Sequence, residues 1–266
     1  MKAKTIYLFS AIAIVFATLL SSCGKSNEPS PLVAQSERLA LDFNQLADES
    51  PNFVSSIDVD YADATLGIDI AFADSAVTAA DCSEALVQFA VAQYLKGHTG
   101  ANLDEIINTL TKEDGKLAVK IVDVKGDSAV YNIGHTRLKQ LLKLRPMEIG
   151  YSEAKTSLEA ILANSCEAYA AQYKAETCEF EVKGGFAQYT LTFAKPSAFA
   201  SLTQPTLTGR YLKVLQAKYD DLGACRPFVE DLVKSLDIDG YRFVYTDKAE
   251  TKTLSAALPW RLIDKQ

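Results

Sequence analysis

Two stretches of alternating apolar residues, about 120 positions apart, share one spacing and constrain the fold more than any other feature of the chain. Each stretch holds two segments in which apolar and polar residues alternate around a short turn, a pattern that predicts a β-hairpin. The two stretches match without a gap at an offset of 121 positions, so we predict that one folded unit occurs twice. The matching pairs are Val59 with Phe180, Tyr61 with Val182, Ile68 with Tyr189, Ile70 with Leu191, and Phe72 with Phe193.

A helical stripe and the strand after it recur in the same order. The stripe has the i, i+3, i+4, i+7 spacing of an amphipathic helix and returns 126 positions later, and the strand returns after 124 positions. We therefore predict an α+β fold made of two tandem copies of an α-β-β-α-α-β unit, residues 34–146 and 147–266, with antiparallel sheet or sheets packed by helices. The stripes are Leu103, Ile106, Ile107, Leu110 and Val229, Leu232, Val233, Leu236, and the strands are Leu117, Val119, Ile121 and Tyr241, Phe243, Tyr245.

Helices are also expected at about residues 32–47, 81–96 and 152–173. A further strand at residues 129–133 and a short helix at 138–142 are expected at the end of the first copy. The pattern leaves open whether the two copies share one continuous sheet or form two lobes.

Residues 1–22 have the order of a secretory signal peptide, because Lys2 and Lys4 precede an uncharged apolar run from Thr5 to Leu20. This run is shorter than the about 20 residues that a membrane-spanning helix needs. At its end, Leu20-Ser21-Ser22-Cys23 resembles the lipobox of bacterial lipoproteins. The resemblance implies that Cys23 is the lipid attachment residue and the first residue of the mature chain. Acyl chains such as palmitate would then hold the protein on a membrane.

Residues 23–33 are expected to be the lipidated cysteine and a flexible tether, since "GKSNEPSP" is rich in Gly, Ser and Pro. In the enteric version of the lipoprotein family, an aspartate after the cysteine accompanies retention in the inner membrane, whereas this chain has Gly24. Glu28 is the only acidic residue between Cys23 and Glu37, so a strong acidic export tag is lacking. The resemblance therefore favours the cell envelope, at the outer membrane and facing the periplasm.

The charge balance argues against nucleic acid as a partner. Removing residues 1–22 takes away two lysines and no acidic residue, which leaves 25 basic against 34 acidic residues and a net charge of −9. Such a chain repels a phosphate backbone and anionic headgroups alike. The lipid itself is therefore the expected contact with the membrane.

Four further cysteines, Cys82, Cys166, Cys178 and Cys225, lie in a chain that we expect outside the cytosol, where disulfides persist. Two bridges in three connectivities can be drawn among them. Cys166 and Cys178 are closest in sequence and form our first choice of pair, and four unbridged thiols that pack as small apolar residues are the alternative.

No set of residues with the spacing of a catalytic, cofactor-binding or metal site stands out, so none is predicted. Neither His98 nor His135 has a cysteine, a second histidine or a carboxylate at the spacing of a metal site. We expect His98 to be a loop residue and His135 to lie at the start of a helix. Asp58, Asp60, Asp63 and Asp69 are expected on the polar face of the first hairpin, since alternation requires such a face.

The leading hypothesis is a lipid-anchored, non-catalytic envelope protein that binds a protein partner or a small ligand in a groove between its two repeats. The alternative is a periplasmic hydrolase that acts on peptidoglycan, glycan or peptide. Its active site would combine His98 or His135 with a serine and one of the carboxylates between Asp58 and Asp69.

Overall fold

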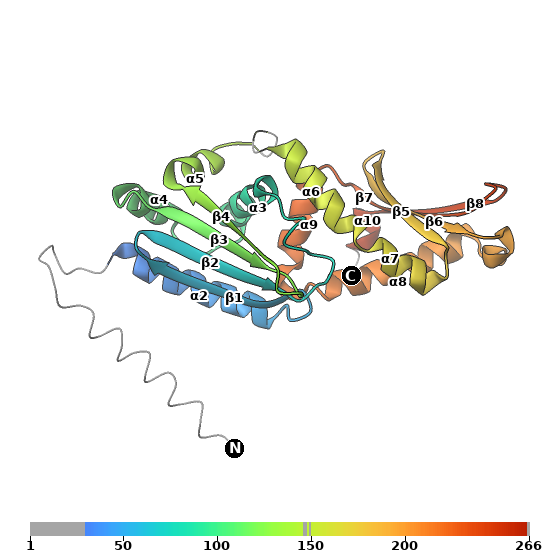
Figure 1. The fold of residues 1–266 in the computed structure, drawn as a ribbon, viewed down its shortest axis with the longest axis horizontal. Helices are drawn as coiled ribbons and strands as arrows, with labels where there is room; N and C mark the ends of the chain where they lie inside the picture. The colour runs from blue at the N-terminus through green and yellow to red at the C-terminus, as the bar shows by residue number, and fades with distance from the viewer. Residues whose placement is uncertain (1–29, 146–147, 149, 265–266) are drawn as a thin grey trace, which may run out of the picture. The chain divides into compact units, whose positions relative to one another are not determined.

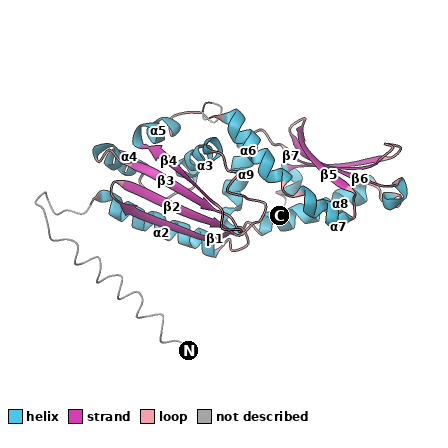
Figure 2. Cartoon of the chain, viewed as in Figure 1, coloured by secondary structure: helices cyan, strands magenta, loops and turns pink. Residues whose placement is uncertain are grey.

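A computed structural model describes residues 30–145, 148 and 150–264. Two four-stranded sheets, each packed by helices, form two similar halves (Figures 1 and 2). This arrangement confirms the α+β class and the duplication, and it answers the question of the sheets, because each half has its own. The signal peptide, the lipid attachment at Cys23 and most of the tether lie outside the described residues.

Both halves run in the same order of helices and strands. The first half consists of α2 (Pro31–Asp48), β1 (Val54–Ala62), β2 (Thr65–Phe72), α3 (Glu84–Gly97), α4 (Leu103–Lys112), β3 (Lys116–Val122), β4 (Ser128–Gly134) and α5 (His135–Leu141). The second half consists of α6 (Tyr151–Ala163), α7 (Cys166–Tyr173), β5 (Thr177–Lys183), β6 (Phe186–Phe193), η2 (Pro196–Phe199), α8 (Gln204–Asp220), η3 (Gly223–Cys225), α9 (Arg226–Ser235), β7 (Gly240–Asp247), β8 (Thr253–Pro259) and α10 (Trp260–Ile263).

The strand registers of the two sheets are equivalent. In the first sheet, Ile68 of β2 lies between Val59 of β1 and Val119 of β3. In the second sheet, Tyr189 of β6 lies between Phe180 of β5 and Phe243 of β7. These are the residues that the offsets of 121 and 124 positions align. Residues aligned in the sequence therefore occupy equivalent positions in the two sheets.

The expectation of antiparallel sheets is correct for the hairpins and wrong for the central pairs. β1–β2, β3–β4, β5–β6 and β7–β8 are antiparallel, but β2–β3 and β6–β7 are parallel. The two helices between the central strands carry the chain back to the end of the sheet at which the preceding strand began, and a strand that starts there runs parallel to it. The repeated unit also extends to the fourth strand and the helix after it.

The long helix expected at residues 152–173 is two helices, α6 and α7, with a break at Asn164 and Ser165. The Asn164 side chain donates hydrogen bonds to the Ala76 carbonyl (2.9 Å) and to Asp81 Oδ2 (2.7 Å), which both precede α3. Ser165 Oγ accepts a hydrogen bond from Lys218 Nζ of α8 (3.1 Å). Polar side chains with partners outside the helix compete with helical hydrogen bonding, which explains the break.

Each half closes its last hairpin around a buried carboxylate at the same position of the repeat, Asp123 and Asp247, 6% and 2% exposed. Asp123 accepts hydrogen bonds from the backbone amides of Ala79 (3.1 Å), Lys125 (2.9 Å) and Asp127 (3.1 Å), and these lower its pKa, the Ala79 bond most. Burial raises the pKa of Asp247, but hydrogen bonds from Lys252 and the neighbouring turn outweigh it, and the pKa is lowered.

We expect Asp123→Asn to lower the midpoint of thermal unfolding at pH 7 by a few degrees, since the new amide group would face a backbone N–H. The folded-state pKa lies below the unfolded value, so the carboxylate stabilises the fold above the unfolded pKa. This contribution is lost as the pH falls through the folded pKa, and the difference between variant and wild type should therefore shrink in acid. Thermal melts at several pH values measure it. Asp127→Asn, at an exposed position of the same turn, is the control, and an equal loss in that variant would contradict the assignment.

Candidate functional site

The inner faces of the two sheets carry side chains of different size at equivalent positions. Tyr189 and Phe243 of the second sheet correspond to Ile68 and Val119 of the first. In the second half, Tyr211 of α8 stacks on Phe243 with ring centroids 3.5 Å apart, and aromatic side chains occupy the space between helix and sheet. The first sheet carries aliphatic side chains at these places, and its inner face is hollow.

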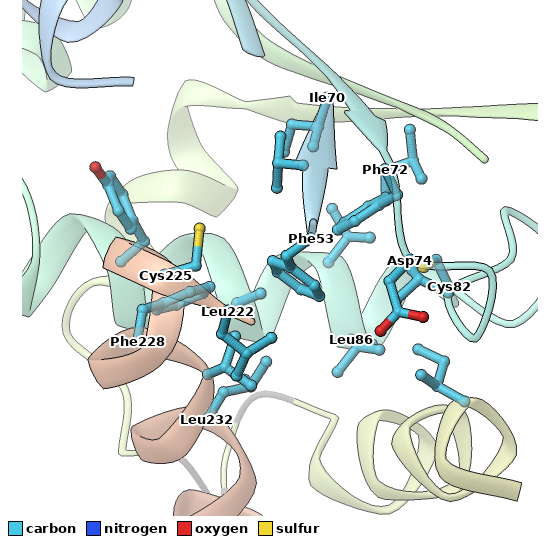
Figure 3. A pocket seen from close by; sticks show the side chains of 18 of the residues that line it. Phe53, Ile70, Phe72, Asp74, Cys82, Leu86, Leu222, Cys225, Phe228 and Leu232 are labelled. Atoms are coloured by element: carbon cyan, nitrogen blue, oxygen red, sulfur yellow. The ribbon is translucent and has the colours of Figure 1, made fainter. Parts of the chain in front are cut away.

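The hollow is an apolar cavity of about 240 Å³ (Figure 3). Ile70 and Phe72 of the sheet project into it on one side, and Phe228 and Leu232 of α9 on the other. The other lining residues are Phe43, Leu46, Phe53, Val54, Ile57, Ile68, Asp74, Ala76, Val77, Cys82, Leu86, Val87, Ala90, Val91, Tyr94, Leu95, Val119, Ile121, Leu158, Ile161, Leu162, Lys218, Tyr219, Leu222, Cys225, Val229, Val233 and Tyr241.

Helices of the second half form one wall of this cavity, because α6 and α9 pack against α3 (Figure 1). Gln93 Nε2 of α3 donates a hydrogen bond to Ser235 Oγ of α9 (2.8 Å), and Tyr94 meets the Phe228 ring edge to face at 5.5 Å. The site is therefore a groove between the two repeats, and the first sheet forms one of its walls.

An empty apolar space of this size is costly. Protein interiors are close-packed, with few voids larger than a water molecule. At about 24 cal/mol per Å³, a sealed and empty cavity of 240 Å³ would destabilise the fold by about 6 kcal/mol. This cavity is partly open, so its cost is smaller than that of a sealed one, and an apolar ligand that excluded water from it would stabilise the fold.

A polar pocket of about 310 Å³ adjoins the cavity. It is lined by Asn52, Ser75 and Asp221 and, among the residues shared with the cavity, by Asp74 and Lys218. Lys218 Nζ donates a hydrogen bond to Ser165 Oγ (3.1 Å). Burial lowers the pKa of the Lys218 amine, and the negative charge of Asp74 opposes this shift. Asp221 Oδ1 accepts a hydrogen bond from Asn52 Nδ2 (3.1 Å).

Two of the four thiols, Cys82 and Cys225, line the cavity and are buried. Burial and the nearby Asp81 and Asp123 raise the pKa of Cys82 to about 11, and burial raises that of Cys225. Both thiols are therefore protonated near neutral pH, and they serve as small apolar wall residues there.

The other two thiols, Cys166 at the start of α7 and Cys178 of β5, lie in hydrogen-bonding contact with each other. All four cysteines of the described residues are unbridged. The disulfide between Cys166 and Cys178 stays a prediction, for which this contact supplies the required proximity.

In protein matured outside the cytosol, we expect one disulfide between Cys166 and Cys178, which closes a short loop and stabilises the chain by about 3 kcal/mol. Mass spectrometry after alkylation of the denatured, unreduced protein should then find two alkylated thiols, Cys82 and Cys225. Cys178→Ser is the control and should expose Cys166 to the reagent. Four alkylated thiols in the wild-type protein would contradict the bridge.

The structure separates the residues of the hydrolase hypothesis. His98 Nε2 lies 3.4 Å from Asp231 Oδ2 beside α9, and His135 Nδ1 lies 3.6 Å from Asp114 Oδ1 at the start of α5. Within the described residues, no hydrogen bond links either histidine to a serine hydroxyl. The carboxylates of the first hairpin are on the outer face of its sheet, with Asp69 paired to Lys120 at 3.2 Å.

Over the same described part of the chain, no group of three His, Cys, Asp or Glu side chains is placed to hold a metal ion. The helices found there are all too short or too polar to cross a membrane.

The sequence predicts a groove between the two repeats, but not the residues that line it. A signal was present at four aligned positions, where Ile68, Leu117, Val119 and Ile121 of the first copy match Tyr189, Tyr241, Phe243 and Tyr245 of the second. A search of protein-family models, curated proteins and solved structures finds no match to this chain.

Proposed function

We propose that this chain is a lipid-anchored, non-catalytic protein of the cell envelope that binds a small apolar ligand in the cavity between its two repeats. The observation that carries the proposal is the apolar cavity of about 240 Å³, which lies against the first sheet, where Ile68 and Val119 stand in place of Tyr189 and Phe243.

A small ligand suits the cavity better than a protein partner does. The lining is concave and almost wholly apolar, and most of its side chains are buried or half-buried rather than spread over an outer surface. Small-molecule sites have this form, with apolar walls and a few polar groups at one end. An engineered apolar cavity of about 150 Å³ is enough to bind benzene, and this one is larger.

Replacing cavity residues with their counterparts from the second half should abolish binding. We expect Val119→Phe and Ile68→Tyr, which copy Phe243 and Tyr189, to weaken binding of the apolar dye N-phenyl-1-naphthylamine at least about tenfold. The fluorescence of the dye rises in an apolar site and measures its affinity. The chain from Gly24 onward contains the whole described body and needs no detergent, so it is the protein to use.

The matched control is Val130→Phe, at a position of β4 that is 56% exposed. This variant should bind the dye like the wild type. Thermal melts of all variants without dye report whether the fold is kept. A folded Val119→Phe variant with unchanged dye affinity, or a wild-type protein that does not bind the dye, would refute a ligand site in the cavity.

The anchor is proposed from the lipobox, and its test is independent of the cavity. We expect labelled palmitate to be incorporated into the full chain in bacterial cells and the protein to fractionate with the outer membrane. Cys23→Ala should lose the label and fail to mature as a lipoprotein. Ser22→Ala, which keeps a small residue before the cysteine, is the control. Label retained in Cys23→Ala would contradict attachment at Cys23.

A further inference from the structure

The apolar cavity and the polar pocket have Phe53, Asp74, Lys218 and Leu222 in common in their linings, so the charged groups Asp74 and Lys218 lie at the border between an apolar and a polar space. We propose that the ligand is a single-chain amphiphile with a zwitterionic head that carries a phosphate and an amine. The chain lies in the cavity, the phosphate meets Lys218, and the amine meets Asp74 and Asp221. This inference rests on the proposed function and names its ligand class.

The size of the cavity favours one chain over two. Its volume of about 240 Å³ lies just below the roughly 300–1,000 Å³ of sites for drug-sized ligands. The walls consist of aliphatic and aromatic side chains from the sheet, α3 and α9. Apart from Asp74 and Lys218, they present almost no polar group to an acyl chain in the cavity. An unbranched acyl chain makes no hydrogen bonds in water, so it gives up none when it enters apolar surroundings.

The charges at the open end favour a head of mixed sign. Lys218 extends from α8 into the space that both pockets share, where its amine is held by Ser165 and lies in the field of Asp74. Asp74 projects from the loop after β2, and Figure 3 shows its carboxylate at the edge of the apolar side chains. Asp221 stands at the outer rim, oriented by Asn52.

A head of a single charge would leave part of this arrangement unmatched. An anionic head would pair with Lys218 but would face two carboxylates, and a cationic head would pair with the carboxylates but would face the lysine. A zwitterion places a charge opposite each group, and hydrogen bonds between charged groups are the strong ones in a partly dry site. Electrostatic complementarity of this kind selects among ligands that share the same chain.

The test compares three detergents with one dodecyl chain, each below its micellar concentration: dodecylphosphocholine, dodecyltrimethylammonium and dodecyl sulfate. Displacement of N-phenyl-1-naphthylamine from the chain that begins at Gly24 gives the affinity of each. For the wild type we expect dodecylphosphocholine to bind at least about tenfold more tightly than either singly charged detergent.

Variants of the charged groups should change that order in opposite directions. Lys218→Met should favour dodecyltrimethylammonium, and the double variant Asp74→Asn with Asp221→Asn should favour dodecyl sulfate. Lys213→Met, an exposed lysine of the same helix, is the matched control and should keep the wild-type order. Dye affinity should be unchanged in the Lys213→Met control, and thermal melts verify that each of the other variants is folded.

The outcomes separate the two proposals. If the three detergents bind equally, or if their order is the same in every variant, the head does not lie at Lys218 and this inference is overturned while the cavity remains a site. If no detergent displaces the bound dye, this inference is likewise overturned, whereas a wild type that does not bind the dye refutes the proposed function as well.

Discussion

A parallel pair of strands lies at the centre of each sheet, and the rest of the structure depends on it. β2 and β3, or β6 and β7, run in the same direction, so the chain between them must cross from one end of the sheet to the other. It does so through two helices on the inner face. Each sheet therefore has one face that must be covered and one that meets water, which accounts for the acidic hairpin residues on the outside. What differs between the halves is how well the inner face and its helices fit.

That fit is a matter of side-chain volume. In the second half, Tyr211 stacks on Phe243, and its hydroxyl donates a hydrogen bond to Tyr245 (3.1 Å). In the first half, smaller residues leave the inner face short of contacts, and helices of the other copy complete the enclosure. One copy therefore supplies a rigid packed body, and the other supplies a space whose walls that body holds in place.

Much of this fold could be predicted because its periodicities are local. The offsets of 121 and 124 positions that align Ile68 with Tyr189 and Val119 with Phe243 are also the offsets of the strand ladders. The direction of the central strands was predicted wrongly, because their alternation is typical of antiparallel sheets, whereas parallel strands usually read as continuous apolar runs. The break at Asn164 depends on partners in the loop before α3, which are distant in sequence. The charged end of the cavity was missed for the same reason, because Asp74 and Lys218 meet only through packing.

Trp260 is the single tryptophan of the chain, and its place in the second half gives the protein an optical property that depends on the cavity. Its ring is buried, donates a hydrogen bond to the Ile238 carbonyl (2.6 Å), and meets Tyr219 and Tyr241 edge to face at 5.3 and 5.8 Å. Both tyrosines also line the cavity. One layer of rings thus separates the indole from the space, and a ligand that moved those rings would change the emission of the indole without any added label.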